Sequence, residues 1–343
     1  MISKKSVAHR VMAGTVVAGA VVAFLAAPPS VPVKAFQPYY PYPCPFTSGG
    51  RDFDGDGFEM PLAFWDPKSG FWRFSGGGTD TTWGTYGDIP APGNYNGDTL
   101  AGNHVDDVAV WRPSNGNWYV KCSSATNCPG GTIIFNWGTA GDIPVPGDYN
   151  NDGFTDYGIW RPSTGTWYIR SGNGFGSLTP AGGVTWGAFG DCPVPGRLAG
   201  GGPGIFDLAV WRPSNGVLYY GRSFSTGTGG VSMVFGTYGD IPFSIDVDGN
   251  GDGNFVVWRP STGVWYQTLG PITFSGVAWG TKGDIPSVRS KTSAQNLELE
   301  VFRPSTRQVY RCFSPVGAAC GSTETDIFFT AVSDAVFINA RNR

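Results

Sequence analysis

The sequence has few of the residues that catalytic sites require. Only two of its 343 residues are histidines, His9 and His104. The HExxH, G-x-S-x-G, Walker and dinucleotide-binding glycine motifs are all absent. A nucleophile activated by histidine would therefore have to use His104, which lies beside Asp106 and Asp107. We expect a protein that is not an enzyme, with a polysaccharide-active enzyme using paired carboxylates as an alternative.

Charged residues are also scarce, at 14% of the chain, and Lys and Arg form no extended cluster. Nucleic acids and anionic membrane surfaces are bound through such clusters, so neither is an expected partner. The chain has no Cys-x-x-Cys pair, which disfavours a zinc site. Beyond the single apolar run Val11–Ala27, no stretch is apolar for long enough to cross a bilayer.

Residues 1–35 have the features of a secretory signal peptide. Positive charges precede the apolar run of 17 residues, and Val33-Lys34-Ala35 offers small residues for cleavage before Phe36. Pro28 and Pro29 follow the run, which argues against a stable membrane span. Removal of four positive charges with this segment changes the net charge from −3 to −7. We expect a secreted protein with an N-terminal segment at 36–50 and a folded domain at 51–343; an uncleaved N-terminal anchor is the alternative.

One pattern recurs six times between Arg51 and the C-terminus. Its first aromatic residue recurs at intervals of 44 to 51 residues, at Trp65, Trp111, Trp160, Trp211, Trp258 and Phe302. Repeats of this length, rich in strand-forming residues and interrupted by Gly and Pro, are typical of propeller blades. The fold class is therefore predicted to be all-β, a six-bladed β-propeller.

The third copy predicts four short strands. These are 156–161, 166–170, 183–187 and a last strand that opens at Cys192-Pro193. Proline cannot donate to a central ladder, so the last strand should lie at an edge of a sheet. Between the first two strands, Pro162-Ser-Thr-Gly165 predicts a tight turn with Gly165 in the left-handed conformation.

Each copy has three positions for a large apolar residue, and all 13 tryptophans of the chain occupy them. The other five positions hold Leu218, Phe235, Phe302, Val309 and Phe329. Because replacements are always apolar, we expect these side chains to pack between blades, each aromatic removing roughly 150–250 Å² from water. Stacking on sugars is the alternative.

Two charged residues also recur. An Arg follows the first Trp, and an Asp stands in Gly-Asp-Ile-Pro or its equivalent; the Arg series is Arg112, Arg161, Arg212, Arg259, Arg303, and the Asp series is Asp88, Asp142, Asp191, Asp240, Asp284. Partly buried charges need partners, so we expect the two series to pair. Asp66 replaces the Arg in the first copy, where the pair should be missing.

Six cysteines fit an oxidising compartment. Cys122 and Cys312 each follow a second-strand Tyr, which predicts the hairpin disulfides Cys122–Cys128 and Cys312–Cys320. Cys44 and Cys192 remain, and either a bridge between them or two free thiols would account for the pair.

Acidic loops provide the strongest indication of a site. The third copy reads D-x-N-x-D-G-x-x-D and the fifth has the same spacing, with oxygen ligands at alternate positions and a glycine at the turn, as calcium loops require. The first and second copies retain parts of the pattern, and the fourth and sixth have lost it. The predicted calcium ligands are Asp148, Asn150, Asp152 and Asp156; Asp246, Asp248, Asn250 and Asn254; Asp52, Asp54 and Asp56; and Asn94, Asn96, Asp98 and Asp107. Metal-free Asn/Asp/Gly turns are the alternative.

At these residues the chain resembles the FG-GAP/VCBS repeat family, whose calcium-binding loops lie between propeller strands, as in integrin heads. The resemblance covers about 51–343, although Trp-Gly…Gly-Asp-Ile-Pro stands in place of the family's Phe-Gly-Gly-Ala-Pro-like motif. It implies a calcium-stabilised propeller that binds ligands or accompanies secreted enzymes and adhesins.

We therefore expect a monomeric calcium-binding propeller that recognises an extracellular glycan or protein, in adhesion or as a scaffold. A lectin with aromatic sites between blades is the second alternative. The variable loops 123–131, 172–182 and 222–231 are the expected places for ligand specificity. Pro43-Cys44-Pro45 and Ser333-Asp334-Ala335-Val336 resemble the same last-strand element, and a closed six-bladed ring needs only one of them.

Overall fold

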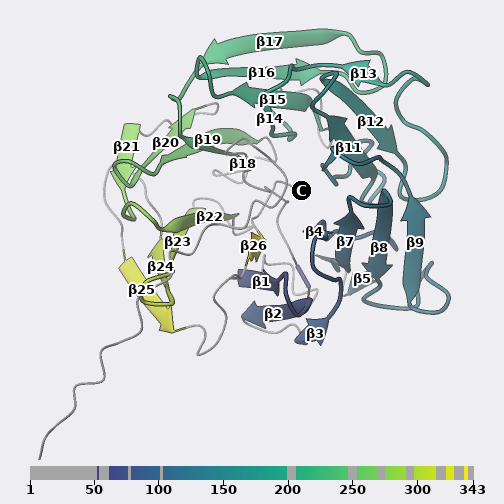
Figure 1. Ribbon diagram of the computed structural model, residues 1–343, viewed down its shortest axis with the longest axis horizontal. Helices are drawn as coiled ribbons and strands as arrows, with labels where there is room; N and C mark the ends of the chain where they lie inside the picture. Colours follow the sequence, from purple (N-terminus) through teal and green to yellow (C-terminus); the bar gives the residue numbers. More distant parts are fainter. Residues whose placement is uncertain are drawn as a thin grey trace, which may run out of the picture. The chain divides into compact units, whose positions relative to one another are not determined.

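The computed structural model describes residues 52–53, 62–75, 79–100, 103–198, 206–245, 253–268, 275–290, 297–313, 322–327 and 336–338. These residues belong to one compact unit, 33–343. Six four-stranded antiparallel sheets form a ring, which confirms the six-bladed propeller (Figure 1). Within the described residues, no helix has the length and apolar character needed to cross a membrane.

We number the blades by their order around the ring. Blade 1 contains β26 (Val336–Ile338), β1 (Leu62–Asp66), β2 (Phe71–Ser75) and β3 (Thr81–Thr82). Blade 2 contains β4 (Ile89–Pro90), β7 (Val108–Arg112), β8 (Asn117–Lys121) and β9 (Thr132–Asn136), with the added hairpin β5 (Thr99–Leu100) and β6 (Asn103–His104). Blade 3 contains β10 (Ile143–Pro144), β11 (Tyr157–Arg161), β12 (Thr166–Arg170) and β13 (Val184–Thr185).

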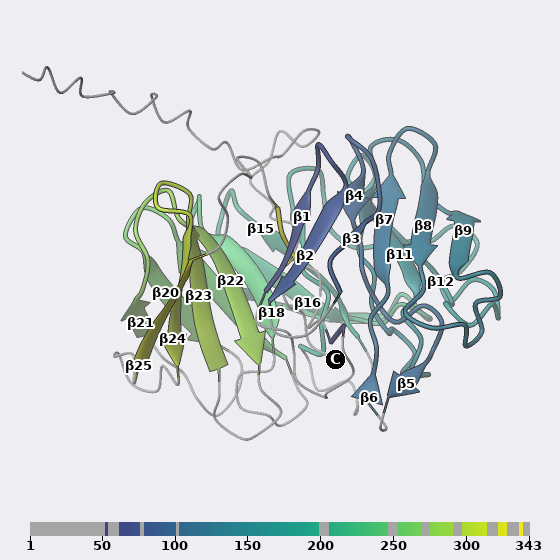
Figure 2. The same ribbon diagram turned by 90° about the horizontal axis from the view of Figure 1, so that it is seen from below.

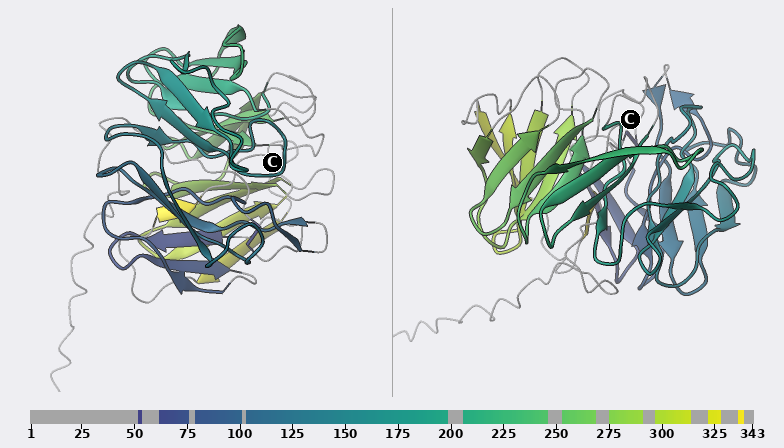
Figure 3. Two further views of the ribbon diagram at one scale, coloured as in Figure 1. Left: turned by 90° about the vertical axis from the view of Figure 1, so that its right-hand side faces the viewer. Right: turned by 90° about the horizontal axis from the view of Figure 1, so that it is seen from above.

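Blade 4 contains β14 (Cys192–Pro193), β15 (Leu208–Arg212), β16 (Val217–Arg222) and β17 (Gly229–Val234). Blade 5 contains β18 (Ile241–Ile245), β19 (Asn254–Arg259), β20 (Val264–Thr268) and β21 (Ser275–Ala278). Blade 6 contains β22 (Ile285–Ser290), β23 (Leu297–Arg303), β24 (Gln308–Phe313) and β25 (Ser322–Ile327). Seen from the side, the strands of each blade run between the two faces of the ring (Figure 2, Figure 3).

The proline-containing strand lies at the inner edge of the sheet in blades 2 to 6, which confirms its predicted edge position (Figure 1). It does not pair with the strands that precede it in its own sequence copy. Cys192 and Pro193 instead pair with Trp211 and Val210 of the following copy. The structural blade is therefore offset by one strand from the sequence repeat, so each blade joins residues of two copies.

The ring is closed by the C-terminal element. Strand β26 pairs antiparallel with β1, and its partners are Ala63↔Ile338, Phe64↔Phe337 and Trp65↔Val336. The last strand of the described residues thereby supplies the inner strand of blade 1. The competing N-terminal element Pro43-Cys44-Pro45 lies outside the described residues.

The tryptophans form a repeated hydrogen-bonded core. Those at the first and second positions of each copy are fully buried, as predicted for fold-forming residues. In blade 3, the indole N–H groups of Trp160 and Trp167 both donate to the carbonyl oxygen of Trp186, at 3.3 and 2.8 Å. Trp186 in turn donates to the carbonyl oxygen of Tyr219 in blade 4, at 3.3 Å. A third-position tryptophan therefore joins its own blade to the next.

The turn glycine is required by close backbone approach. Gly165 has φ of +64°, and a Cβ at this position would lie 2.2 Å from the carbonyl oxygen of Gly187. The predicted left-handed conformation of Gly165 is confirmed. In blade 6 the equivalent residue is Arg307, which adopts φ of 57° without being glycine.

The predicted pairing of the two charged series is also confirmed. Arg Nε lies 2.6 to 2.8 Å from Asp Oδ1 in five pairs, which are Arg112–Asp88, Arg161–Asp142, Arg212–Asp191, Arg259–Asp240 and Arg303–Asp284. Each Asp precedes the inner strand of a blade, whereas each Arg ends the strand beside it. In blade 1, Asp66 accepts hydrogen bonds from Lys68 N and Ser69 Oγ at 3.0 and 2.5 Å.

Candidate calcium loops and inter-blade pocket

The acidic loops join the inner strand of a blade to the second strand. In blade 3, the side chains at the first and third loop positions meet on one backbone amide. Oδ1 of Asp148 and Oδ1 of Asn150 both accept from Asp152 N, at 3.1 and 3.2 Å. Gly153 N donates to Asp148 Oδ2 at 3.0 Å, and its φ of +86° provides the sharp turn that calcium loops have at their sixth position.

The loop of blade 2 has the same arrangement despite its inserted hairpin. Oδ1 of Asn94 and Oδ1 of Asn96 both accept from Asp98 N, at 3.2 and 3.1 Å. The hairpin β5–β6 follows, extending from one face of the ring (Figure 2). Its residue His104 places Nδ1 3.0 Å from Asn94 Nδ2, so this histidine contacts the acidic loop.

Asp98 is the most unusual residue of this loop. Only 6% of its surface is exposed. Its Oδ2 accepts hydrogen bonds from Asn96 Nδ2 and Ser123 Oγ, at 3.1 and 2.8 Å. Its Oδ1 is buried and has no hydrogen-bond partner within the described part of the chain. A buried carboxylate oxygen without a donor is costly, and a bound cation would satisfy it.

The residue at the ninth loop position, four residues before the first Trp, is an acid that accepts hydrogen bonds from backbone amides. We call this place the brace position. Asp156 accepts from Tyr149 N and Gly172 N at 2.8 and 3.0 Å, and it thereby joins the loop to the end of β12. Asp107 accepts from Tyr95 N and Ser123 N at 2.9 and 2.7 Å. The metal-ligand role of both residues stays a prediction.

Burial perturbs these acids. Desolvation has the largest effect on the carboxyl groups of Asp107 and Asp156. It raises the pKa of Asp107 to about 7 and that of Asp156 to about 8. The pKa of Asp148 is also raised, mainly by desolvation. Each carboxylate is therefore held in surroundings that favour either a proton or a neighbouring cation.

The brace position persists where the rest of the acidic pattern has been lost. Asp207 in the fourth copy and Glu298 in the sixth occupy it, and both are buried, as is Asn254 in the fifth. Sequence reasoning missed Asp207 and Glu298 because it searched for the complete loop pattern. Their constant distance of four residues before Trp211 and Phe302 could have revealed them.

Backbone hydrogen bonds join the loops of neighbouring blades. The amide at the eighth position donates to the carbonyl at the first position of the preceding loop in three cases, which are Asp106 N to Asp52 O at 2.7 Å, Thr155 N to Asn94 O at 2.7 Å and Gly253 N to Arg197 O at 2.8 Å. Loop conformation is therefore coupled between blades through main-chain atoms, including at the fourth copy, which has lost its acidic side chains.

The remaining predicted ligands are only partly described. Asp52 is buried, and its amide donates to Asp106 Oδ2 at 2.9 Å. The predicted ligands Asp54, Asp56, Asp246, Asp248 and Asn250 lie outside the described residues. Across the described ranges, no group of three or more His, Cys, Asp or Glu side chains is placed to hold a metal ion. The loops of blades 2 and 3 combine carboxylates with Asn oxygens.

Four of the described cysteines are disulfide-bonded, and two of them close the hairpin beside the blade 2 loop. Cys122 and Cys128 are bonded, as predicted, with their Cα atoms 6.5 Å apart. Cys192 and Cys312 are also disulfide-bonded, so Cys192 is not the free thiol of the alternative interpretation. Their predicted partners Cys44 and Cys320 lie outside the described residues.

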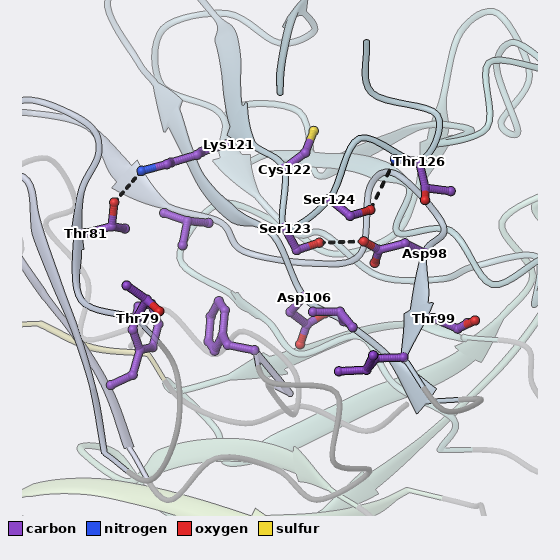
Figure 4. A pocket seen from close by; sticks show the side chains of 15 residues that line it. Thr79, Thr81, Asp98, Thr99, Asp106, Lys121, Cys122, Ser123, Ser124 and Thr126 are labelled. Carbon is purple, nitrogen blue, oxygen red and sulfur yellow. Dashed lines mark hydrogen bonds between the residues drawn. The ribbon is translucent and has the colours of Figure 1, made fainter. Parts of the chain in front are cut away.

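A pocket of about 570 Å³ lies between blades 1 and 2 (Figure 4). Its walls come from the strands of both blades, the hairpin β5–β6 and the disulfide-bonded loop after β8. It is lined by Phe53, Phe74, Thr79, Thr81, Asp98, Thr99, Leu100, Val105, Asp106, Val108, Lys121, Cys122, Ser123, Ser124 and Thr126. Part of the variable loop 123–131 therefore lines a cavity, and Asp98 belongs to both the pocket and the acidic loop.

Comparisons with known proteins assign the chain to no family. No protein-family model matches the chain, and no curated protein sequence matches it. The structure is similar to that of BBS1N in complex with ARL6DN, at 12% identity and a TM-score of 0.46, with 90% of this chain and 94% of that chain covered. It is also similar to a streptogramin B lyase, at 8% identity and a TM-score of 0.41, covering 78% and 89% of the two chains.

A third similar structure is the dihydro-heme d1 dehydrogenase NirN, at 10% identity and a TM-score of 0.42, with 82% of this chain and 67% of that chain covered. At these identities the similarity concerns the fold alone.

Proposed function

We propose that this protein is a secreted, non-catalytic β-propeller that binds calcium in its acidic loops and recognises an extracellular ligand. The supporting observation is the buried Oδ1 of Asp98, which lacks a donor within the described residues. Asn94, Asn96 and Asp98 would hold the ion in blade 2, and Asp148, Asn150 and Asp152 would hold it in blade 3. These hard oxygen donors suit calcium. The predicted calcium sites of the first and fifth copies belong to the same proposal.

The role of calcium in this proposal is structural. A divalent cation supplies positive charge to carboxylates that the fold has already desolvated, and thereby stabilises the ionised form of each acid. The acidic loops also hydrogen-bond one another across blades. Calcium would therefore stabilise the ring as well as the individual loop.

A calcium titration tests the proposal. The protein is stripped with a chelator, and metal content and the melting temperature are measured as CaCl2 is returned. At a concentration about 100 times the dissociation constant, a single site stabilises the fold by about 2.7 kcal/mol. Asp98→Asn and Asp152→Asn should each reduce the stabilisation and the metal content. The control Asp66→Asn, which alters an acid outside the acidic loops, should change neither.

Absence of bound calcium together with an unchanged melting temperature would refute the calcium claim. The non-catalytic claim has its own assay, in which a panel of polysaccharides is incubated with the protein and new reducing ends are measured. We expect none. Turnover abolished by one Asp→Asn substitution outside the acidic loops would establish an enzyme instead.

A further inference from the structure

The pocket between blades 1 and 2 is lined by Thr81, at a position where the next four copies carry an apolar side chain, which is Phe135, Val184, Met233 or Val277. Between blades 2 and 3, the guanidinium of Arg170 lies 4.8 Å from the ring centroid of Phe135 and 6.0 Å from that of Trp137. Phe135 stands two residues before Trp137, and the equivalent residue before Trp83 is Thr81. Thr81 thus places a hydroxyl group where blade 2 has a phenyl ring.

The cation facing this place has also changed. Arg170 stands two residues after Tyr168, and the equivalent residue after Tyr119 is Lys121. Lys121 Nζ is hydrogen-bonded to Thr81 Oγ1 (Figure 4). Among the described residues, no carboxylate forms an ion pair with the Lys121 ammonium group. An ammonium has three donors, so this half-buried cation retains donors for a further acceptor.

Aromatic and hydroxyl groups line other parts of the pocket. The rings of Phe53 and Phe74 lie with their centroids 4.5 Å apart, and both line the cavity together with Ser124 and Thr126. A sugar ring has an apolar C–H face and a hydroxylated edge, which match an aromatic wall and a hydroxyl-bearing loop. The volume of about 570 Å³ falls within the range of roughly 300–1,000 Å³ common for small-molecule sites.

We propose that this pocket binds a sugar residue that carries a carboxylate, as in a uronic acid, with Lys121 bound to the carboxylate. The inference rests on the proposed function, because Asp98 and Asp106 also line the pocket and would repel an anion. Calcium held by Asp98 would offset both charges. Uronate binding should therefore depend on calcium, and binding of a neutral sugar should not.

Calorimetry with matched sugars tests the proposal. Glucuronic and galacturonic acids are compared with glucose and galactose in about 5 mM calcium, above the range of roughly 10⁻⁴–10⁻³ M for weak extracellular sites. The uronic acids should bind at least about tenfold more tightly, as a hydrogen bond to a charged group allows. Methyl glycosides of the uronic acids show whether the ligand binds alone or as the end of a glycan.

Variants separate the parts of the site. Lys121→Met should remove the preference for uronic acids, and Lys121→Gln repeats the test if Met impairs folding. Lys282→Met, at an exposed lysine in the turn before β22, should change nothing. Thr81→Phe restores the ring present in blade 2 and should abolish all sugar binding while the melting temperature is maintained.

Equal affinity for uronic and neutral sugars would overturn the proposal. Failure of every uronic acid to bind a protein that demonstrably holds calcium would also overturn it. A protein that binds uronic acids without binding calcium would instead refute the calcium claim and leave the pocket assignment standing.

Discussion

The repeated Arg–Asp pair makes a sharp prediction about stability. Arg161 and Asp142 form two hydrogen bonds, Nε to Oδ1 at 2.8 Å and Nη2 to Oδ2 at 2.9 Å. The Asp142 side chain is 1% exposed, whereas that of Arg161 is 28% exposed. Arg161→Met removes the cation and leaves a buried carboxylate without its strongest partner.

The magnitude follows from this burial. Breaking a buried pair costs about 3–5 kcal/mol, whereas exposed pairs contribute about 0–1 kcal/mol. Asp142 keeps a hydrogen bond from Thr139 N at 2.8 Å, and the arginine is partly solvated. We therefore expect Arg161→Met to lower the free energy of unfolding by about 2–4 kcal/mol. Part of this loss comes from the stacking of Arg161 on Tyr168, whose ring centroid is 4.7 Å away.

Urea denaturation followed by tryptophan fluorescence measures the change. Arg161→Lys keeps the charge but cannot form the bidentate hydrogen bonds to Asp142. It should therefore lower the free energy of unfolding by about half as much as Arg161→Met. The double variant Arg161→Met with Asp142→Asn removes both charges and should be more stable than Arg161→Met alone. The control is Arg73→Met, since Arg73 and Asp80 lie 3.6 Å apart with side chains 44% and 38% exposed, and its cost should stay below about 0.5 kcal/mol. If Arg161→Met costs no more than Arg73→Met, the structural role assigned to the pair is wrong.

Three further predictions concern other parts of the ring. Without calcium, the free energy of unfolding should fall as the pH rises from about 4 to about 8. In this range the folded protein keeps protons on Asp107 and Asp156, whereas in the unfolded chain the same side chains have an ordinary pKa of 3.8 and lose them. Calcium should flatten this dependence in melting curves recorded across the same pH range, and a calcium-free protein that gains stability over the range would contradict the burial argument. Arg307→Gly should raise stability by about 1 kcal/mol in urea titrations, since its φ of 57° is unfavourable for a residue with a Cβ; a loss would show that contacts of the Arg307 side chain outweigh the backbone strain. Replacement of both Cys122 and Cys128 by Ser should cost about 2 kcal/mol, as expected for a separation of 6 residues. The same variant should weaken ligand binding at the pocket more than it weakens calcium binding, and equal losses would indicate that the whole blade had been disturbed.

Most of the fold could be predicted from local patterns. The left-handed turn at Gly165 and the strand over 166–170 both appear in the structure with the expected residues. These features depend on neighbours within one copy, and repetition shows which positions tolerate only apolar residues. The Arg–Asp pairs were also predictable, since two charged series that recur together in a fold with few charges need one another.

The candidate site was less predictable. The acidic pattern indicated calcium, but it did not show that Asp156 braces Gly172 N or that Asp98 Oδ1 is buried without a donor in the described residues. Gly172 is sixteen residues after Asp156, so its amide reaches the carboxylate only once β11 and β12 have paired. The buried acids Asp207 and Glu298 were missed for a different reason, because the complete loop pattern was sought and not the single acid four residues before Trp211 and Phe302.

The sequence by itself determined the repeat, its apolar core positions and its turns, because each depends on chemistry repeated within about 50 residues. Tertiary structure alone decided which copy each inner strand joins, which end closes the ring, and where a pocket opens. In the sequence, Thr81 has no feature that distinguishes it from other strand residues, and only the structure shows that Lys121 of blade 2 hydrogen-bonds to it. These features depend on contacts between residues of different copies. The pattern within one copy does not show which residue of the neighbouring blade will contact a given position.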